Sequence, residues 1–152
     1  MLRRLLILAG CCLIASCTLL PVDQDALSYY QLETSKPYDE VLAETEIAIA
    51  EHNFRITGHS RVGKVIRERG AENFPEYDTI QFCNLTLAKQ VLEITPHAIT
   101  YMPCNIVLYQ YAGKTIIRTH LLPEASSNNE LNEFAKTMNP QLKAILDFAA
   151  DN

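Results

Sequence analysis

The sequence lacks the short motifs that mark the common enzyme classes. It has no glycine-rich phosphate loop, no HExxH histidine pair, no GxSxG nucleophile turn and no CxxC pair. These motifs serve phosphate binding, zinc binding, nucleophilic attack and thiol exchange. Acids such as Glu72, Glu76 and Asp78 are interpreted as surface charges, because sequence alone places no two carboxylates at a working distance. We therefore expect a protein that binds rather than one that catalyses.

Basic clusters are also missing from most of the chain. There are 13 Lys and Arg against 18 Asp and Glu, for a formal charge of −5. Loss of an N-terminal leader containing Arg3 and Arg4 would leave 11 against 18, or −7. The mixed charges of residues 61–69 are typical of a solvated helix face. An acidic domain of this kind has no electrostatic attraction for nucleic acid or for anionic lipid, so neither is an expected partner.

The N-terminus has the pattern of an export signal. Arg3 and Arg4 precede an unbroken apolar run from Leu5 to Leu20, which Pro21 ends. A charged start followed by an apolar segment is typical of a cleaved signal peptide. The run is shorter than the roughly 18 residues that a membrane-spanning helix needs, which disfavours a transmembrane anchor.

The end of this run resembles the lipobox of bacterial lipoproteins. Small residues precede Cys17 in Ile14-Ala15-Ser16-Cys17, and such a cysteine receives a diacylglycerol group. The segment 8–11, ending at Cys11, has a similar pattern, but cleavage there would leave fewer than the roughly 7 apolar residues that a signal peptide requires. Cys17 is therefore the predicted lipidation site, and its covalent lipid is the only bound group that we predict. Because Thr18 rather than an aspartate follows it, the sorting rule of two-membrane bacteria favours the outer membrane.

These features divide the chain into three parts. Residues 1–16 are the predicted lipoprotein signal peptide, residues 17–26 a lipidated tether, and residues 27–152 one domain, since 152 residues do not provide two ordinary cores. The expected location is the periplasmic face of the cell envelope. The expected partners are the lipid bilayer, reached through the acyl group, and an unknown envelope protein or small ligand.

The remaining sequence alternates between the two hydrophobic periods. Period-two patterns predict strands at 27–32, 54–58 and 79–83, and two more joined by a tight turn at Ala112-Gly113. Helical spacing predicts helices at 38–52, at 61–69 with Val62, Val65 and Ile66 as its buried residues, after Asn84 as a cap, and at 131–149. In the last helix Pro140 predicts a kink, or a restart with Asn139 as cap. The order indicates an α+β fold, with helices packed on one face of a largely antiparallel sheet.

Cys83 and Cys104 are the best chemical lead, because they flank one strand-helix-hairpin unit. In an exported protein they could form a disulfide, which would contribute roughly 3 kcal/mol by closing a loop of about 22 residues. They could instead be buried free thiols that fill space as small apolar groups. The third alternative is chemical: Cys83 lies beside a helix start that favours a thiolate, and His97 and Met102 are soft metal ligands close to Cys104.

The leading interpretation is a membrane-anchored envelope lipoprotein that acts as a small non-catalytic binding or interaction module. Its ligand groove is predicted beside the sheet, at Asn84, Met102 and Pro103 next to the two cysteines. The alternative is a thiol-redox protein, or a metal- or haem-binding one, that uses Cys83 and Cys104. In the first interpretation the protein holds no metal.

Three stretches of the chain resemble the bacterial domain-of-unknown-function family 302. They are YDEVLAETEIAIAEHNFRI, IQFCNLTLAKQVLE and YMPCNIVLYQYAGKTIIRTHLLPE, which occur in this order. The most telling pieces are Phe82-Cys83-Asn84, Met102-Pro103-Cys104 and Leu121-Leu122-Pro123. The resemblance covers about residues 27–149, and it implies an α+β domain with a curved antiparallel sheet and no established activity.

Overall fold

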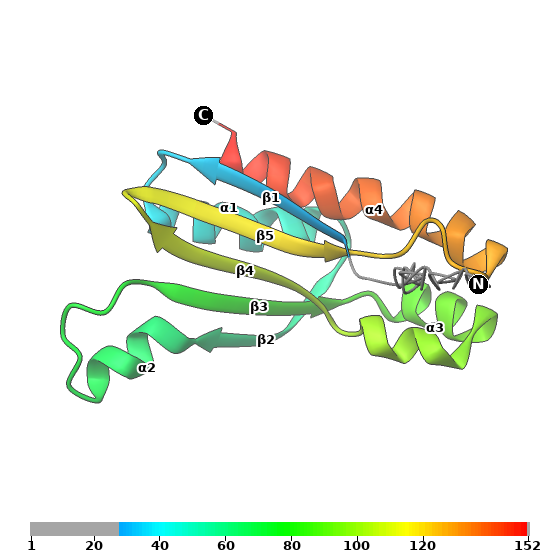
Figure 1. Ribbon diagram of the computed structural model, residues 1–152, viewed down its shortest axis with the longest axis horizontal. Coiled ribbons are helices and arrows are strands. Elements are labelled where there is room, and N and C mark those ends of the chain that lie inside the picture. The colour runs from blue at the N-terminus through cyan, green and yellow to red at the C-terminus, as the bar shows by residue number, and fades with distance from the viewer. Residues whose placement is uncertain (1–27, 152) are drawn as a thin grey trace, which may run out of the picture.

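Five strands form one antiparallel sheet in the order β1-β5-β4-β3-β2 (Figure 1). The computed structural model describes residues 28–151, so the predicted signal peptide (1–16), the predicted tether (17–26) and its lipidation site Cys17 lie outside the described residues. The strands are β1 (Ser28–Thr34), β2 (Arg55–Arg61), β3 (Tyr77–Cys83), β4 (Cys104–Tyr111) and β5 (Lys114–Leu121). The predicted α+β fold with an antiparallel sheet is confirmed.

Two helices, α1 (Tyr38–Glu51) and α4 (Asn129–Ala150), lie side by side against one face of the sheet (Figure 1). The short helix α2 (Val62–Glu68) lies at one end of the sheet, beside β3. At the other end, α3 (Leu85–Ile94) and the 3-10 helix η1 (Pro96–Tyr101) continue from β3 and lead back to β4. None of the helices formed by residues 28–151 is long and apolar enough to span a membrane.

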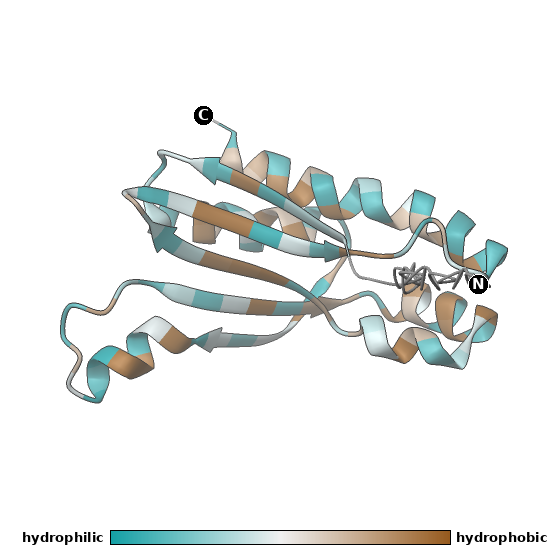
Figure 2. Ribbon diagram, in the orientation of Figure 1, coloured by the Kyte–Doolittle hydropathy of each residue, from teal (hydrophilic) through white to brown (hydrophobic). Residues whose placement is uncertain are grey.

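The core fills the space between the sheet and the two long helices. Alternate residues of the central strands point into it, so Ile80 and Phe82 of β3 are fully buried between exposed or half-buried neighbours. The apolar stripe of α4 faces them with Leu142, Ile145 and Leu146. Figure 2 shows the alternation along the strands and the stripe on the helix. Each such side chain contributes roughly 1.5 to 3 kcal/mol by leaving water, so these contacts hold the two layers together.

Local signals set the ends of several elements, of which the Asn84 cap and the Ala112-Gly113 turn were predicted. Asn53 ends α1 with a φ of 60°, and Ala112 and Gly113 form the β4–β5 turn with φ values of 49° and 75°. Asn84 caps α3, and its Oδ1 accepts hydrogen bonds from the backbone N–H groups of Thr86 (3.0 Å) and Leu87 (3.1 Å). Asparagine and glycine tolerate the left-handed conformation, which explains why these positions can be found by sequence.

The buried side of α2 differs from the prediction. Val62 and Val65 are 46% and 43% exposed, whereas Gly63 is the buried residue of this helix. The helix turns its glycine toward the backbone of residues 75–77, because only a residue without a side chain fits there. The valines consequently remain on the outside.

The restart predicted at Pro140 is wrong, because α4 runs through it as one helix of 22 residues. Asn139 is not a cap. Its side chain instead accepts from the Leu122 N–H at 2.9 Å and donates to the Leu122 carbonyl at 3.0 Å. Pro140 removes one helical hydrogen bond. The helix tolerates this loss because the preceding residue, Asn139, is hydrogen-bonded to Leu122 directly after β5.

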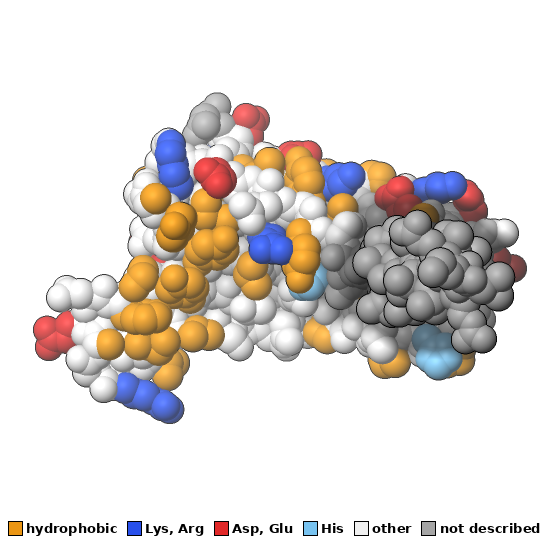
Figure 3. Space-filling model, in the orientation of Figure 1, with side chains coloured by type: hydrophobic (Ala, Val, Ile, Leu, Met, Phe, Trp, Pro, Cys, Tyr) orange, Lys and Arg blue, Asp and Glu red, His pale blue; other side chains and the backbone are white. Residues whose placement is uncertain are grey.

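The second face of the sheet is not covered by α1 or α4 and has its own apolar side chains. Figure 3 shows them gathered over β3, β4, β5 and α2. A shallow hollow there is lined by Val62, Phe74, Tyr77, Val107 and Tyr109, among others. The rings of Tyr77 and Tyr109 stack at 5.8 Å with an interplanar angle of 4°. The cross-strand aromatic pair stabilises the exposed side of the sheet.

Candidate functional site

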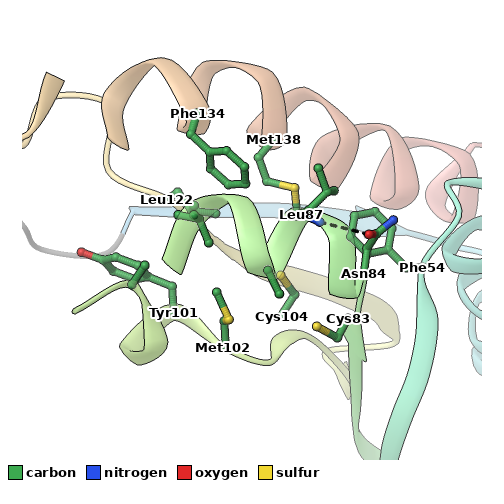
Figure 4. Close-up of a pocket in the computed structure, with 13 residues that line it drawn as sticks. Phe54, Cys83, Asn84, Leu87, Tyr101, Met102, Cys104, Leu122, Phe134 and Met138 are labelled. Carbon is green, nitrogen blue, oxygen red and sulfur yellow. Dashed lines mark hydrogen bonds between the residues drawn. The ribbon is translucent and has the colours of Figure 1, made fainter. Parts of the chain in front are cut away.

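A small apolar pocket lies where α3, η1 and α4 meet the ends of β3 and β4 (Figure 4). Cys83, Asn84, Met102 and Cys104, all predicted to belong to the site, are among its lining residues. The free space is about 400 Å³ when the open mouth is counted, but only about 30 Å³ is available to the centres of water-sized molecules. No acid, lysine, arginine or histidine is among the lining residues.

Cys83 and Asn84 are placed by the junction between β3 and α3. Cys83 is the last residue of β3, opposite Arg55 of β2. Asn84 follows as the cap of α3, and Figure 4 draws its hydrogen bond to Leu87. Its amide Nδ2 also donates to the Asn53 carbonyl at 2.9 Å. One side chain therefore fixes the start of α3 against the end of α1, and this holds the pocket wall in place.

Cys104 begins β4 and is half-buried. Desolvation, and to a lesser degree the nearby Cys83, raise the pKa of Cys104 to about 11. A thiol with this pKa carries almost no negative charge near neutral pH. Cys104 is therefore a poor nucleophile in the empty pocket.

The two cysteines are free thiols in the described structure. Antiparallel pairing places Phe82, not Cys83, directly opposite Cys104. Cross-strand partners point to the same face, whereas the next residue along a strand alternates to the other face. The two cysteines are therefore diagonal neighbours. Both line the pocket because β3, and with it the alternation of faces, ends at Cys83. The disulfide between them stays a prediction.

The far wall comes from α4 and was not assigned to the site by sequence reasoning. Phe134 and Met138 lie four residues apart on one side of α4, and Leu122 precedes them at the end of β5. Val91 of α3 and Tyr101 of η1 complete the enclosure. The helical spacing identified Phe134 and Met138 as core residues, but no sequence signal places them beside the cysteines.

Pro103 and His97 are placed elsewhere. Pro103 lines an adjoining, more polar hollow together with Gln81, Asn105 and His120, and Met102 and Cys104 border both spaces. His97 is not among the lining residues of either space; its carbonyl accepts a hydrogen bond from Thr100 Oγ1 at 2.9 Å. Among residues 28–151, no group of three or more His, Cys, Asp or Glu is arranged to hold a metal.

A separate polar cluster joins α1 to β2 and β3. His59 Nε2 lies 3.0 Å from Asp78 Oδ2, and His59 Nδ1 lies 3.4 Å from Glu46 Oε1. Burial, followed by the charge of Asp78, raises the pKa of the Tyr38 phenol above its ordinary value. The Tyr38 hydroxyl donates to the Leu108 carbonyl at 3.4 Å. The cluster links α1 to the sheet through His59, and it gives the buried Asp78 Oδ2 a partner but leaves Asp78 Oδ1 without a hydrogen bond among residues 28–151.

An open antiparallel sheet with two helices on one face and a small apolar pocket at one end defines a class of small α+β domains. The family model for "Domain of unknown function DUF302" matches residues 30–149, and the chain belongs to this family. A solved DUF302 protein from Bacillus stearothermophilus is similar with a TM-score of 0.68 and 23% sequence identity. The match covers 80% of this chain and 97% of that one, and it shows the shared fold. No curated protein matches this chain.

Proposed function

We propose that this protein is an envelope lipoprotein, anchored through a lipid on Cys17, that binds a small ligand in the pocket beside Cys83 and Cys104. The anchor rests on the lipobox pattern and on the export signal before it. The binding role rests on the pocket itself. Pockets of this kind are apolar and concave, with a few polar groups that orient the ligand.

The observation that carries the proposal is the composition of the pocket wall. Its polar side chains are the Asn84 amide and the Tyr101 phenol, beside two thiols. General acid-base catalysis needs groups that exchange protons near the working pH. The Cys104 thiol, with a pKa of about 11, is not such a group. This wall supports binding without catalysis, and it disfavours thiol exchange, which proceeds through a thiolate.

The size of the pocket limits the ligand. Pockets for drug-sized organic molecules have volumes of roughly 300 to 1,000 Å³. Here the space open to the centres of water-sized molecules is about 30 Å³, which suits one small group or a single ion. A haem is far larger than this space, so the haem-binding alternative is not proposed.

The position of the first strand supports a membrane-facing pocket. Ser28, where β1 begins, pairs with Leu121, and the next residue, Leu122, lines the pocket. The ten residues between Cys17 and Ser28 span at most about 35 Å. A lipid on Cys17 would therefore hold the pocket end of the domain close to the bilayer.

The accessibility of the pocket can be tested with xenon, an apolar probe that enters small dry cavities. The chain contains three methionines, of which Met102 and Met138 line the pocket. With methyl-labelled methionine, we expect xenon pressure to shift the Met102 and Met138 resonances in a saturable manner. Unchanged pocket methyls would contradict a pocket that admits ligands.

The anchor can be tested with Cys17→Ser in cells. Without the thiol no diacylglycerol can be attached, so we expect the protein to leave the membrane fraction almost completely. The matched control is Cys11→Ser, which should leave the membrane-bound fraction unchanged. The measurement is fractionation followed by mass spectrometry of the N-terminal peptide. If Cys17→Ser remains acylated and membrane-bound while Cys11→Ser does not, the lipidation site is misassigned.

A further inference from the structure

We propose that the pocket is a binding site for a soft monovalent metal ion, Cu(I), held by the thiolates of Cys83 and Cys104 and by the thioethers of Met102 and Met138. This inference rests on the proposed small-ligand pocket and names the chemical class of its ligand. All four ligands would come from this chain.

The geometry brings four sulfur-containing side chains to one space. Cys83 ends β3, Cys104 begins β4, Met102 follows η1, and Met138 comes from the middle of α4. Figure 4 shows the four side chains around the same cavity, approaching it from different sides. They are all the cysteines and methionines among residues 28–151. Four separate segments therefore bring the soft side chains of residues 28–151 to the wall of one pocket.

The ligand chemistry selects the metal. Thiolate and thioether sulfur are soft donors that favour Cu(I), whereas carboxylate and carbonyl oxygen favour Mg²⁺ and Ca²⁺. The lining residues include no carboxylate and no imidazole, which are the usual companions of cysteine in zinc sites. The two thioethers make this donor set softer than the cysteine and histidine sets of usual zinc sites, which favours Cu(I).

The free space agrees with an ion. About 30 Å³ open to the centres of water-sized molecules is space for one ion, toward which the sulfur side chains would move to coordinate it. An acyl chain or a ring would require Met138, Leu87 and their neighbours to move. Methionine is flexible and adjusts its sulfur to the position of an ion at low cost.

Binding transfers protons and no electrons. Each of Cys83 and Cys104 exchanges an S–H bond for an S–Cu bond, and the two protons leave to solvent. The product is a bis-thiolate complex with one net negative charge. This charge lies next to the N-terminal end of α3, where the helix dipole stabilises an anion. In the empty pocket, burial keeps Cys104 protonated, so the thiol is protected from oxidation until a metal displaces its proton.

The test is an anaerobic titration of the full-length lipoprotein in detergent with Cu(I), buffered by a chromogenic chelator. The protein is first reduced with a phosphine, and the two thiols are counted by alkylation of a denatured sample. We expect one Cu(I) per chain and an X-ray absorption spectrum with a sulfur-only first shell. Because thiol protons are released on binding, the apparent affinity should fall by about 10-fold or more for each pH unit of acidification.

Matched variants identify the ligands. Cys83→Ser and Cys104→Ser should each weaken binding by about 100-fold or more, and the nearly isosteric Met102→Leu and Met138→Leu by about 10-fold. His97→Asn, a change outside the pocket, should leave the affinity unchanged. Circular dichroism of each variant without metal shows whether it remains folded.

The outcomes separate the two proposals. Binding of one Cu(I) per wild-type chain, with much weaker binding by the cysteine variants, supports the site. Equal Cu(I) binding by wild type and by Cys83→Ser/Cys104→Ser, or no binding against the chelator, overturns it. If Cu(I) does not bind while xenon still shifts the Met102 and Met138 methyls, the small-ligand pocket stands and only its metal is wrong. If neither enters, both proposals fail.

Discussion

Gly63→Ala should lower the free energy of unfolding by about 2 to 3 kcal/mol, although alanine favours a helix by roughly 1 kcal/mol over glycine. A Cβ at this position would lie 2.4 Å from the Pro75 carbonyl oxygen and 2.7 Å from the Tyr77 nitrogen. Both atoms belong to the backbone, and Tyr77 begins β3, so neither can move without shifting the strand. The steric cost therefore exceeds the gain in helix propensity.

Gly58→Ala is the matched control for this prediction. Its Cβ would lie 2.6 Å from Gln81 Oε1, which is the end of a flexible side chain. The glutamine can rotate away, so we expect a loss of less than about 1 kcal/mol. Urea unfolding of the two variants measures the difference. Equal losses would show that the approach of α2 to the 75–77 backbone is not close in solution.

Asn139→Ala should cost about 3 kcal/mol of stability. Asn139 is 1% exposed and pairs with both backbone groups of Leu122, and its Nδ2 also donates to Glu124 Oε1 at 2.7 Å. Alanine would leave the Leu122 N–H and carbonyl without this partner in a buried position, at roughly 1 to 3 kcal/mol for each group. The helix propensity of alanine offsets only about 0.5 kcal/mol of this loss.

The control is Gln141→Ala on the exposed side of the same helix. Its one side-chain hydrogen bond, from Nε2 to the Thr137 carbonyl at 3.2 Å, is accessible to water. We expect a change within about 0.5 kcal/mol. Thermal and urea unfolding of both variants give the comparison. Because Leu122 lines the pocket, Asn139→Ala should also reduce the xenon response of Met138. A loss for Asn139→Ala as small as that for Gln141→Ala would mean that water replaces the asparagine.

The accurate predictions concern features that a few neighbouring residues decide. Period-two alternation placed the central strands, because successive strand residues point to opposite faces. Asn84 as a helix cap and Ala112-Gly113 as a turn follow from the conformations that these residues allow. The strand-helix-hairpin unit was predicted for the same reason, since β3 runs directly into α3 and a tight turn joins β4 to β5.

The errors occur where contact with a segment distant in the sequence determines which side chain is buried or which group it binds. Gly63 rather than Val62 faces inward, because the backbone of residues 75–77 passes too close for a side chain. Asn139 has the side chain of a typical cap, yet its partner is Leu122, which lies 17 positions earlier in the chain. The conformational preference of a single residue contributes a few tenths of a kcal/mol to about 1 kcal/mol to stability. Buried contacts such as these contribute more and therefore decide the structure.

The sequence by itself determined the class of fold, the family and the strand-helix-hairpin unit that Cys83 and Cys104 flank. It did so because these depend on hydrophobic period, turn residues and short loops, all of which are local. Only the tertiary structure decided that Met138 and Phe134 close the pocket from α4, and that His97 lies outside it. Packing of α4 against the sheet depends on the sum of many buried contacts across the chain, and no short stretch of residues encodes that sum.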